Sequence, residues 1–176
     1  MCNARLYKFW DDLGTALKTG QPQNEVKHSQ KPAFETLYKE PQRLDQFIGA
    51  MTGFSRANFS ALADKFDFSR YHTLCDVGGA GGLLSILVAK KHPQSRCVSF
   101  DLPAVEPIAS KAIARDGLSD RVKTASGDFF KDSLPKADVI TMGMVLHDWN
   151  LAKKKQLVNS VYAALARAEL SSQWKT

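Results

Sequence analysis

The sequence predicts an α/β fold in which about four parallel strands follow a helical segment. From residue 69 onward, short apolar runs alternate with stretches of ten or more residues whose apolar positions recur at helical spacing. Such alternation is typical of βαβ units and a parallel sheet. Before that point only helical spacing is present. We therefore expect a helical segment over 1–68 and a partial Rossmann-like domain over 69–176.

The individual elements follow from apolar spacing and from glycine and proline positions. The expected helices of the first segment span residues 5–18, 34–39 and 44–66, with a polar loop over 23–32. The expected strands are 74–77, 97–100, 122–126 and 138–146, and the helices between and after them are 83–91, 104–115 and 151–170. Because the fourth strand is apolar almost throughout, we expect it to be buried on both faces.

Composition excludes several classes of protein. The chain has 176 residues, 44% hydrophobic and 24% charged, which are values of an ordinary globular domain. No apolar run approaches the ~20 residues of a membrane span, and no secretion signal begins the chain, so we expect a cytoplasmic protein with no membrane partner. Cys2, Cys75 and Cys97 match no metal motif, so we expect no metal, and the last two read as buried reduced thiols.

The net charge of +6 raises the question of a nucleic-acid partner. The basic residues are scattered, and the two lysine runs, 90–91 and 153–155, are not interleaved with aromatic residues. Solvated helix faces explain these lysines more simply. We therefore expect no nucleic-acid partner.

The strongest functional signal is the glycine-rich segment 76–82, which lies between the first expected strand and its helix. Glycines let the backbone turn tightly and approach a ligand closely, and the helix behind them offers N–H groups. The alternative is a tight turn without a ligand. Neither register of the segment fits the Gly-x-Gly-x-x-Gly pattern of dinucleotide enzymes, which argues against a nicotinamide or flavin cofactor.

Polar residues also follow the other expected strands, and parallel strands bring such residues to one rim of the sheet. We expect Gly78, Asp101, Asp128 and His147 to gather there, each directly after a strand. Asp101 suits the hydroxyls of a ribose, and Asp128 with Phe129 suits an adenine; the alternative roles are helix capping and core packing. An imidazole changes protonation near neutral pH, so His147 is the candidate general base.

Five segments occur in an order that identifies a family: 76–82, 100–103, 127–130, 135–138 and 146–149. Together they resemble the S-adenosylmethionine-dependent O-methyltransferases, the group that contains caffeic acid and acetylserotonin O-methyltransferases. The resemblance runs from about Trp10 to Leu165 and implies a class I methyltransferase Rossmann-like sheet. Nucleic-acid amino-methyltransferases instead typically carry an Asn/Asp-Pro-Pro-Tyr/Phe segment after the fourth strand.

The resemblance implies S-adenosyl-L-methionine as cofactor and a small hydroxylated, aromatic acceptor. It assigns His147 as the base that deprotonates the acceptor and Met51 as an apolar acceptor contact, with residues 1–68 on the substrate side. The residues that match cofactor contacts are Asp76, Gly78, Gly79, Gly82, Asp101, Leu102, Gly127, Asp128 and Phe129.

The sequence also departs from the family pattern. Ala80 stands where the family usually has glycine, which leaves two alternatives: the site tolerates the extra methyl group, or this group crowds the cofactor. Relatives carry an N-terminal dimerisation domain and further C-terminal strands, one with a glutamate that Glu169 does not match. The resemblance thus implies a fragment of a homodimeric parent, with the fourth strand at a sheet edge. Two hypotheses follow: an O-methyltransferase, or a non-catalytic cofactor-binding or dimerising fragment.

Overall fold

The computed structural model describes residues 7–21, 23, 37, 38 and 40–165. Its contacts divide the chain into two compact units, one ending at Phe54 and one beginning at Ser55. The boundary falls inside helix α3, which spans Pro41–Lys65 and confirms the long helix expected over 44–66. The functional division expected between residues 68 and 69 stays a prediction.

The first unit begins with a 3₁₀ helix, Tyr7–Asp12, which leads into α1, Leu13–Thr19. The α-helix expected over 5–18 is therefore shorter than predicted. Gly20 ends α1 with a φ of 66°, the left-handed conformation common after helices. No residue of α1 is buried within the described chain. Most of the loop expected over 23–32 and of the helix expected over 34–39 lies outside the described residues.

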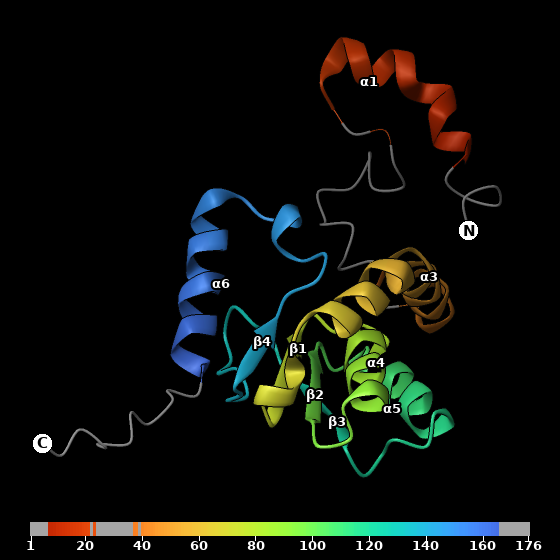
Figure 1. Cartoon of the computed structure of the whole chain (residues 1–176). Helices are drawn as coiled ribbons and strands as arrows, with labels where there is room; N and C mark the ends of the chain where they lie inside the picture. The colour runs from red at the N-terminus through yellow and green to blue at the C-terminus, as the bar shows by residue number, and fades with distance from the viewer. Residues whose placement is uncertain (1–6, 22, 24–36, 39, 166–176) are drawn as a thin grey trace, which may run out of the picture. The chain divides into compact units, whose positions relative to one another are not determined.

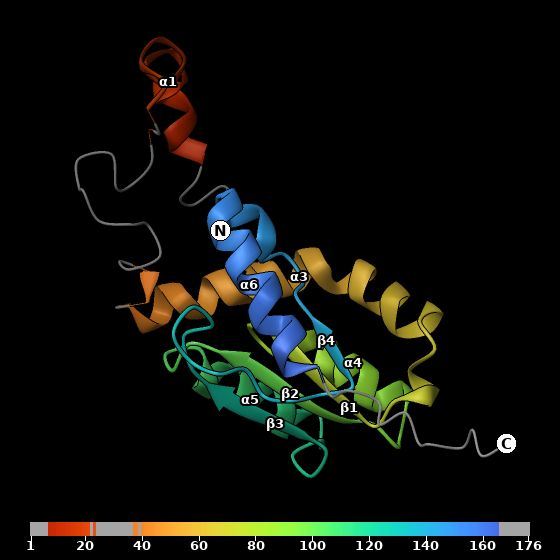
Figure 2. The ribbon, with the colours of Figure 1, turned by 90° about the vertical axis from the view of Figure 1, so that its left-hand side faces the viewer.

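The second unit contains the expected parallel sheet, in the order β3-β2-β1-β4. Its strands are β1 (Thr73–Val77), β2 (Arg96–Asp101), β3 (Val122–Ser126) and β4 (Val139–Thr141). Its helices are α4 (Leu83–Lys91), α5 (Glu106–Arg115) and α6 (Leu151–Ala164), with short 3₁₀ helices at Phe68–Arg70 and Leu146–Asp148. Figures 1 and 2 show α4 and α5 on one face of the sheet and α6 on the other. The α/β class is confirmed.

A hydrophobic core covers each face of the sheet, and β1 contributes to both in alternation. Leu74 packs with Leu84 of α4 and other residues on one face, whereas Cys75 and Val77 pack with Ala164 of α6 on the other. Cys97 belongs to the first cluster, so the two described thiols lie on opposite faces. Both are free and buried, as expected, and burial raises the pKa of each to about 12.

The prediction for the fourth strand is wrong in length and in burial. β4 ends at Thr141 rather than Leu146, and its three residues are only half-buried because it forms an edge of the sheet. Beyond it the chain turns, and Met144 adopts a φ of 58°. The apolar residues here do not pair in the sheet: Val145 lies against Gly78, and Met142 packs in the core on the α6 face.

The last helix also ends earlier than predicted, at Ala164 rather than 170. Leu165 is extended, with a ψ of 127°, and forms a parallel bridge with Ala137 next to β4. Residues 166–170 lie outside the described chain.

Candidate functional site

The glycine loop, residues 78–82, connects β1 to α4 and is held by its own backbone. The N–H groups of Gly78 and Gly79 donate to the carbonyl oxygen of Phe100, at 2.8 and 3.2 Å. The N–H of Ala80 donates to Asp101 Oδ2 at 2.8 Å, and Gly82 N–H donates to the Gly79 carbonyl at 2.8 Å. These bonds join the loop to the carboxyl end of β2.

Close packing explains why two of these positions are glycine. A Cβ at Gly78 would lie 2.5 Å from Val145 Cγ2, and Gly78 also has a φ of 73°. A Cβ at Gly79 would overlap Ser99 Oγ and lie 3.0 Å from the Asp76 carbonyl oxygen. The buried side of the loop therefore has no room for a side chain, because strands β1 and β2 lie close to it.

Ala80 occupies a conformation that suits glycine, with a φ of 49°. A left-handed conformation costs an L-residue about 1–2 kcal/mol. The backbone thus gives a physical reason for the glycine that the family resemblance places here. Crowding of the cofactor by the Ala80 methyl group stays one of the two alternatives.

Asp101 is the last residue of β2 and is the centre of the site. Its Oδ2 accepts from Ala80 N–H, and its Oδ1 accepts from Leu102 N–H at 2.7 Å. Burial raises the pKa of this carboxyl group above its ordinary value, against the opposing effect of these two N–H donors. Gly127 N–H donates to the Asp101 carbonyl at 3.0 Å, which brings the end of β3 to the same rim.

Asp128 lies one residue beyond Gly127 and is also engaged. Burial opposes its ionisation, but Lys131 at 2.9 Å and the N–H of Phe130 at 2.9 Å together lower the pKa of its carboxyl group. The Phe129 ring packs against Phe130 and Trp149, with centroids 4.8 and 6.0 Å away. Asp128 follows β3 after one intervening residue rather than directly.

Sequence reasoning assigned no function to two residues of this aromatic cluster. Trp149 packs edge-on against Phe130 at 4.7 Å, and Lys153 Nζ lies 4.2 Å from the centroid of the Phe130 ring. Lys153 was visible in the sequence only as part of a lysine run. Its spacing of three residues after Asn150, which caps α6, is the signal that places it near the start of that helix.

His147 does not directly follow a strand, contrary to expectation. It lies in the 3₁₀ helix Leu146–Asp148, beyond the turn that ends β4. Its side chain is 59% exposed, and Nε2 lies 3.1 Å from Asp148 Oδ1. Val145, just before this helix, is buried against Gly78, which connects the segment to the glycine loop.

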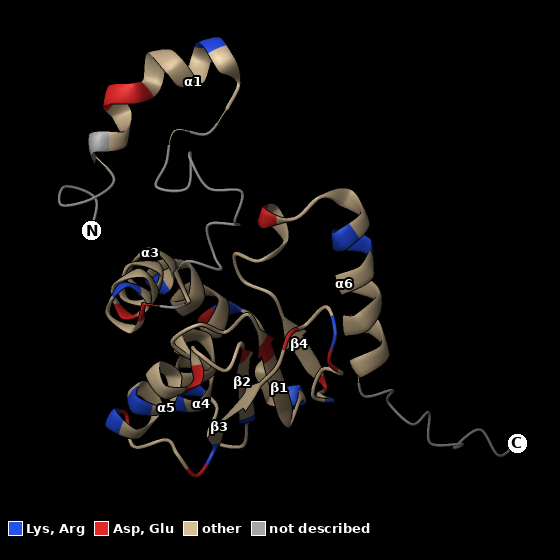
Figure 3. Ribbon diagram, turned by 180° about the vertical axis from the view of Figure 1, so that it is seen from behind, with Lys and Arg blue, Asp and Glu red and all other residues tan. Residues whose placement is uncertain are grey.

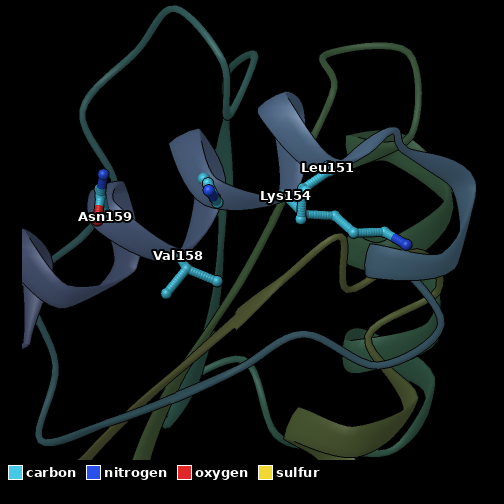
Figure 4. Close-up of a pocket in the computed structure, with 5 residues that line it drawn as sticks. Leu151, Lys154, Val158 and Asn159 are labelled. Atoms are coloured by element: carbon cyan, nitrogen blue, oxygen red, sulfur yellow. The ribbon is translucent and has the colours of Figure 1, made fainter.

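Met51, the predicted acceptor contact, belongs to the first unit, so this contact stays a prediction. A hollow of about 370 Å³ on α6 is lined by Leu151, Lys154, Lys155, Val158 and Asn159, and Figure 4 shows side chains that line it. None of the predicted site residues lines it. Figure 3 shows basic residues spread over α4, α5 and α6.

The described residues contain no group of three or more His, Cys, Asp or Glu side chains suited to hold a metal ion. They also contain no helix with the length and hydropathy that crossing a membrane requires.

Comparison with known proteins identifies the family. Residues 10–169 match the O-methyltransferase domain family. The chain belongs to this family. Its members are S-adenosylmethionine-dependent, and the structurally similar proteins are class I methyltransferases, which confirms the fold and the cofactor class expected from the sequence. The match covers the glycine loop, Asp101 and His147 alike.

Three relatives illustrate the range of the family. N,N-dimethyltransferase OxyT of Streptomyces rimosus is 36% identical over 90% of this chain and 46% of its own length. The tetracenomycin 8-O-methyltransferase TcmO of Streptomyces glaucescens is 33% identical over 94% and 48%. The crystal structure of the O-methyltransferase NcsB1, with S-adenosylmethionine and 2-hydroxy-5-methyl naphthoic acid, matches with a TM-score of 0.78 and 26% identity over 89% and 48%. The chain spans about half the length of these relatives.

Proposed function

We propose that this chain binds S-adenosyl-L-methionine at the glycine loop and Asp101 and belongs to an enzyme that methylates a small aromatic hydroxyl compound. The observation that carries the proposal is the hydrogen-bonded unit of Ala80, Asp101 and Leu102. It places a half-buried carboxyl group beside a loop that has no room for side chains at Gly78 and Gly79. Such a rim, at the carboxyl ends of parallel strands, is where ligands of α/β sheets bind.

The residues present fit the cofactor. Gly78, Gly79 and Gly82 allow close approach to the backbone, Asp101 offers carboxylate lone pairs to ribose hydroxyls, and Asp128 with Phe129 offers a polar and an aromatic contact for adenine. We also assign Asp76, Leu102 and Gly127 to this site, from their positions around the loop and Asp101. When bound, the cofactor supplies an electrophilic methyl group on a sulfonium.

His147 is proposed as the general base. A phenol has a pKa near ~10, so a base that takes its proton as the oxygen attacks accelerates transfer, typically by about 10²–10⁴-fold. Asp148, 3.1 Å from His147 Nε2, would stabilise the imidazolium that forms. The exposure of the imidazole suits a group that meets an acceptor from solvent. Met51 is proposed as an apolar acceptor contact.

The acceptor class rests on the relatives. TcmO is named for 8-O-methylation, and NcsB1 was crystallised with a naphthoic acid, which supports an aromatic hydroxyl acceptor. OxyT is named as an N,N-dimethyltransferase, so an amine acceptor is the alternative. Homodimerisation of a longer parent and a cytoplasmic location stay predictions from the sequence.

A second candidate function is cofactor binding without turnover. It is favoured by the edge position of β4, the strand that leads to His147.

Two measurements separate these functions. Calorimetric titration with S-adenosylhomocysteine tests the cofactor site, and transfer of labelled methyl to hydroxylated naphthoates and to matched amines tests turnover. We expect saturable binding, and hydroxyl methylation that His147→Ala abolishes while binding persists. Binding without transfer to any acceptor favours the second function. A folded chain that does not bind contradicts both.

A further inference from the structure

Three neighbouring strands place polar side chains at one level of the sheet. In the register of the sheet, Asp76 of β1 pairs with Ser99 of β2 on one side and with Thr141 of β4 on the other. Paired residues of parallel strands point to the same face, which here is the face covered by α4 and α5. We call Asp76, Ser99 and Thr141 the polar row. Asp76 and Ser99 are each only 2% exposed.

The polar row lies directly against the glycine loop. Thr141 Oγ1 donates to Asp76 Oδ1 at 2.7 Å. The other carboxyl oxygen, Asp76 Oδ2, lies 3.3 Å from the point where a Cβ of Gly79 would be, and Ser99 Oγ overlaps that same point. Gly79 therefore rests directly on the row.

Burying these polar groups destabilises the fold, and packing alone does not explain why polar residues occupy these positions. The hydroxyl of Ser99 has no hydrogen-bond partner among the described residues. A buried polar group without a partner destabilises the folded chain relative to an apolar group of similar shape. Burial also raises the pKa of Asp76 to about 7, and the hydrogen bond from Thr141 opposes this shift. An alanine at 99 and a valine at 141 would suit an ordinary core better.

We propose that Thr141 and Ser99 are positioning residues for cofactor binding. Thr141 orients the Asp76 carboxyl group, and this group and the Ser99 hydroxyl together hold Gly79 in the conformation that accepts S-adenosylmethionine. The inference rests on the proposed function. It also connects the two halves of the site, because Thr141 ends β4 and the same segment continues through Val145, packed on Gly78, to His147.

The test compares S-adenosylhomocysteine affinity and thermal stability across matched variants. Thr141→Val removes the hydroxyl but keeps the shape, and we expect binding to weaken roughly tenfold, the fold-change that corresponds to the loss of one hydrogen bond. Thr141→Ser keeps the donor and should restore affinity to within about twofold of the unchanged chain. Thr73→Val is the control, because Thr73 begins β1, at the end of that strand away from the glycine loop, and its Oγ1 accepts from Asp138 N–H instead. Its affinity should not change.

Ser99→Ala gives a second and independent readout. Loss of an unpartnered buried hydroxyl should raise the melting temperature. If Ser99 positions the loop, affinity for S-adenosylhomocysteine should fall in the same variant. A purely structural role cannot produce these opposite changes, and the variant carries the test if Thr141→Val does not fold.

Each remaining outcome has one meaning. Unchanged affinity in Thr141→Val and Ser99→Ala overturns the inference alone, as does equal weakening in Thr141→Val and Thr141→Ser. Absence of binding by the unchanged, folded chain overturns the proposed function and the inference with it.

Discussion

The glycine loop and the His147 segment are built in opposite ways. The loop is fixed by backbone hydrogen bonds to Phe100 and Asp101 and rests on buried side chains. His147 lies in a single 3₁₀ turn, is more than half exposed, and its ion pair is with the adjacent residue. The glycine loop, the proposed cofactor side, is thus fixed by several hydrogen bonds within the described chain. The proposed acceptor side instead presents an exposed imidazole on a short turn.

Breaking the loop should have the largest effect. In Gly79→Ala the new methyl group overlaps Ser99 Oγ and lies 3.0 Å from a backbone oxygen that cannot move away. We expect loss of S-adenosylhomocysteine binding and a free energy of unfolding lower by about 1–3 kcal/mol, measured by titration and urea denaturation. Adding Ser99→Ala should recover part of the stability. Gly53→Ala is the control, since a Cβ there meets nothing within 4 Å.

Asp101→Asn should have the next largest effect. Its amide nitrogen cannot accept the N–H of Ala80 or of Leu102, so one of these two bonds is lost. Affinity for S-adenosylhomocysteine should fall about 10–100-fold, as expected for a hydrogen bond to a charged group together with a lost ribose contact. Titration at pH 7 measures this. Unchanged affinity would mean that Asp101 does not touch the cofactor.

The buried Asp76 should make stability depend on pH. Its native pKa of about 7 lies above the ordinary value of 3.8, so the native state binds the proton more tightly than the unfolded chain does. The contribution of this group to the free energy of unfolding is greatest below pH 3.8 and decreases as the pH rises towards about 7. Asp76→Asn should flatten this slope. An equal slope in both chains, by urea titration across this range, contradicts the shift.

Relieving the strain at Ala80 should have a smaller, favourable effect. Ala80→Gly removes the cost of a φ of 49° and should raise the free energy of unfolding by about 1 kcal/mol. Met144→Gly, at a φ of 58°, is the comparison for the His147 segment. A decrease in stability for Ala80→Gly would show that its methyl group packs usefully.

His147→Ala should have the smallest effect on stability, within about 0.5 kcal/mol, because the side chain is exposed. Thermal melts with and without S-adenosylhomocysteine check this. A large decrease would show that the acceptor side is as tightly built as the glycine loop.

The glycine loop is predicted from the sequence better than the His147 segment is, for physical reasons. Glycines directly follow β1 and set its end, so the first strand and the loop are predicted from the sequence pattern. In residues 142–146, Met142 packs in the core on the α6 face and Val145 packs on Gly78, and this apolar run cannot be distinguished from a strand by hydropathy. Ser99 and Thr141 gave no signal singly. Aligning the strands at their carboxyl ends would have placed them beside Asp76.

The two buried thiols allow the opening of the fold to be measured by chemical labelling. Cys75 and Cys97 lie on opposite faces of the sheet, so they cannot form a disulfide with each other in the folded chain. Both thiols are buried and protonated, so alkylating reagents do not reach them either. The rate at which they are labelled therefore measures how often the sheet opens. A bound cofactor analogue should slow that rate in proportion to its occupancy, without any engineered probe.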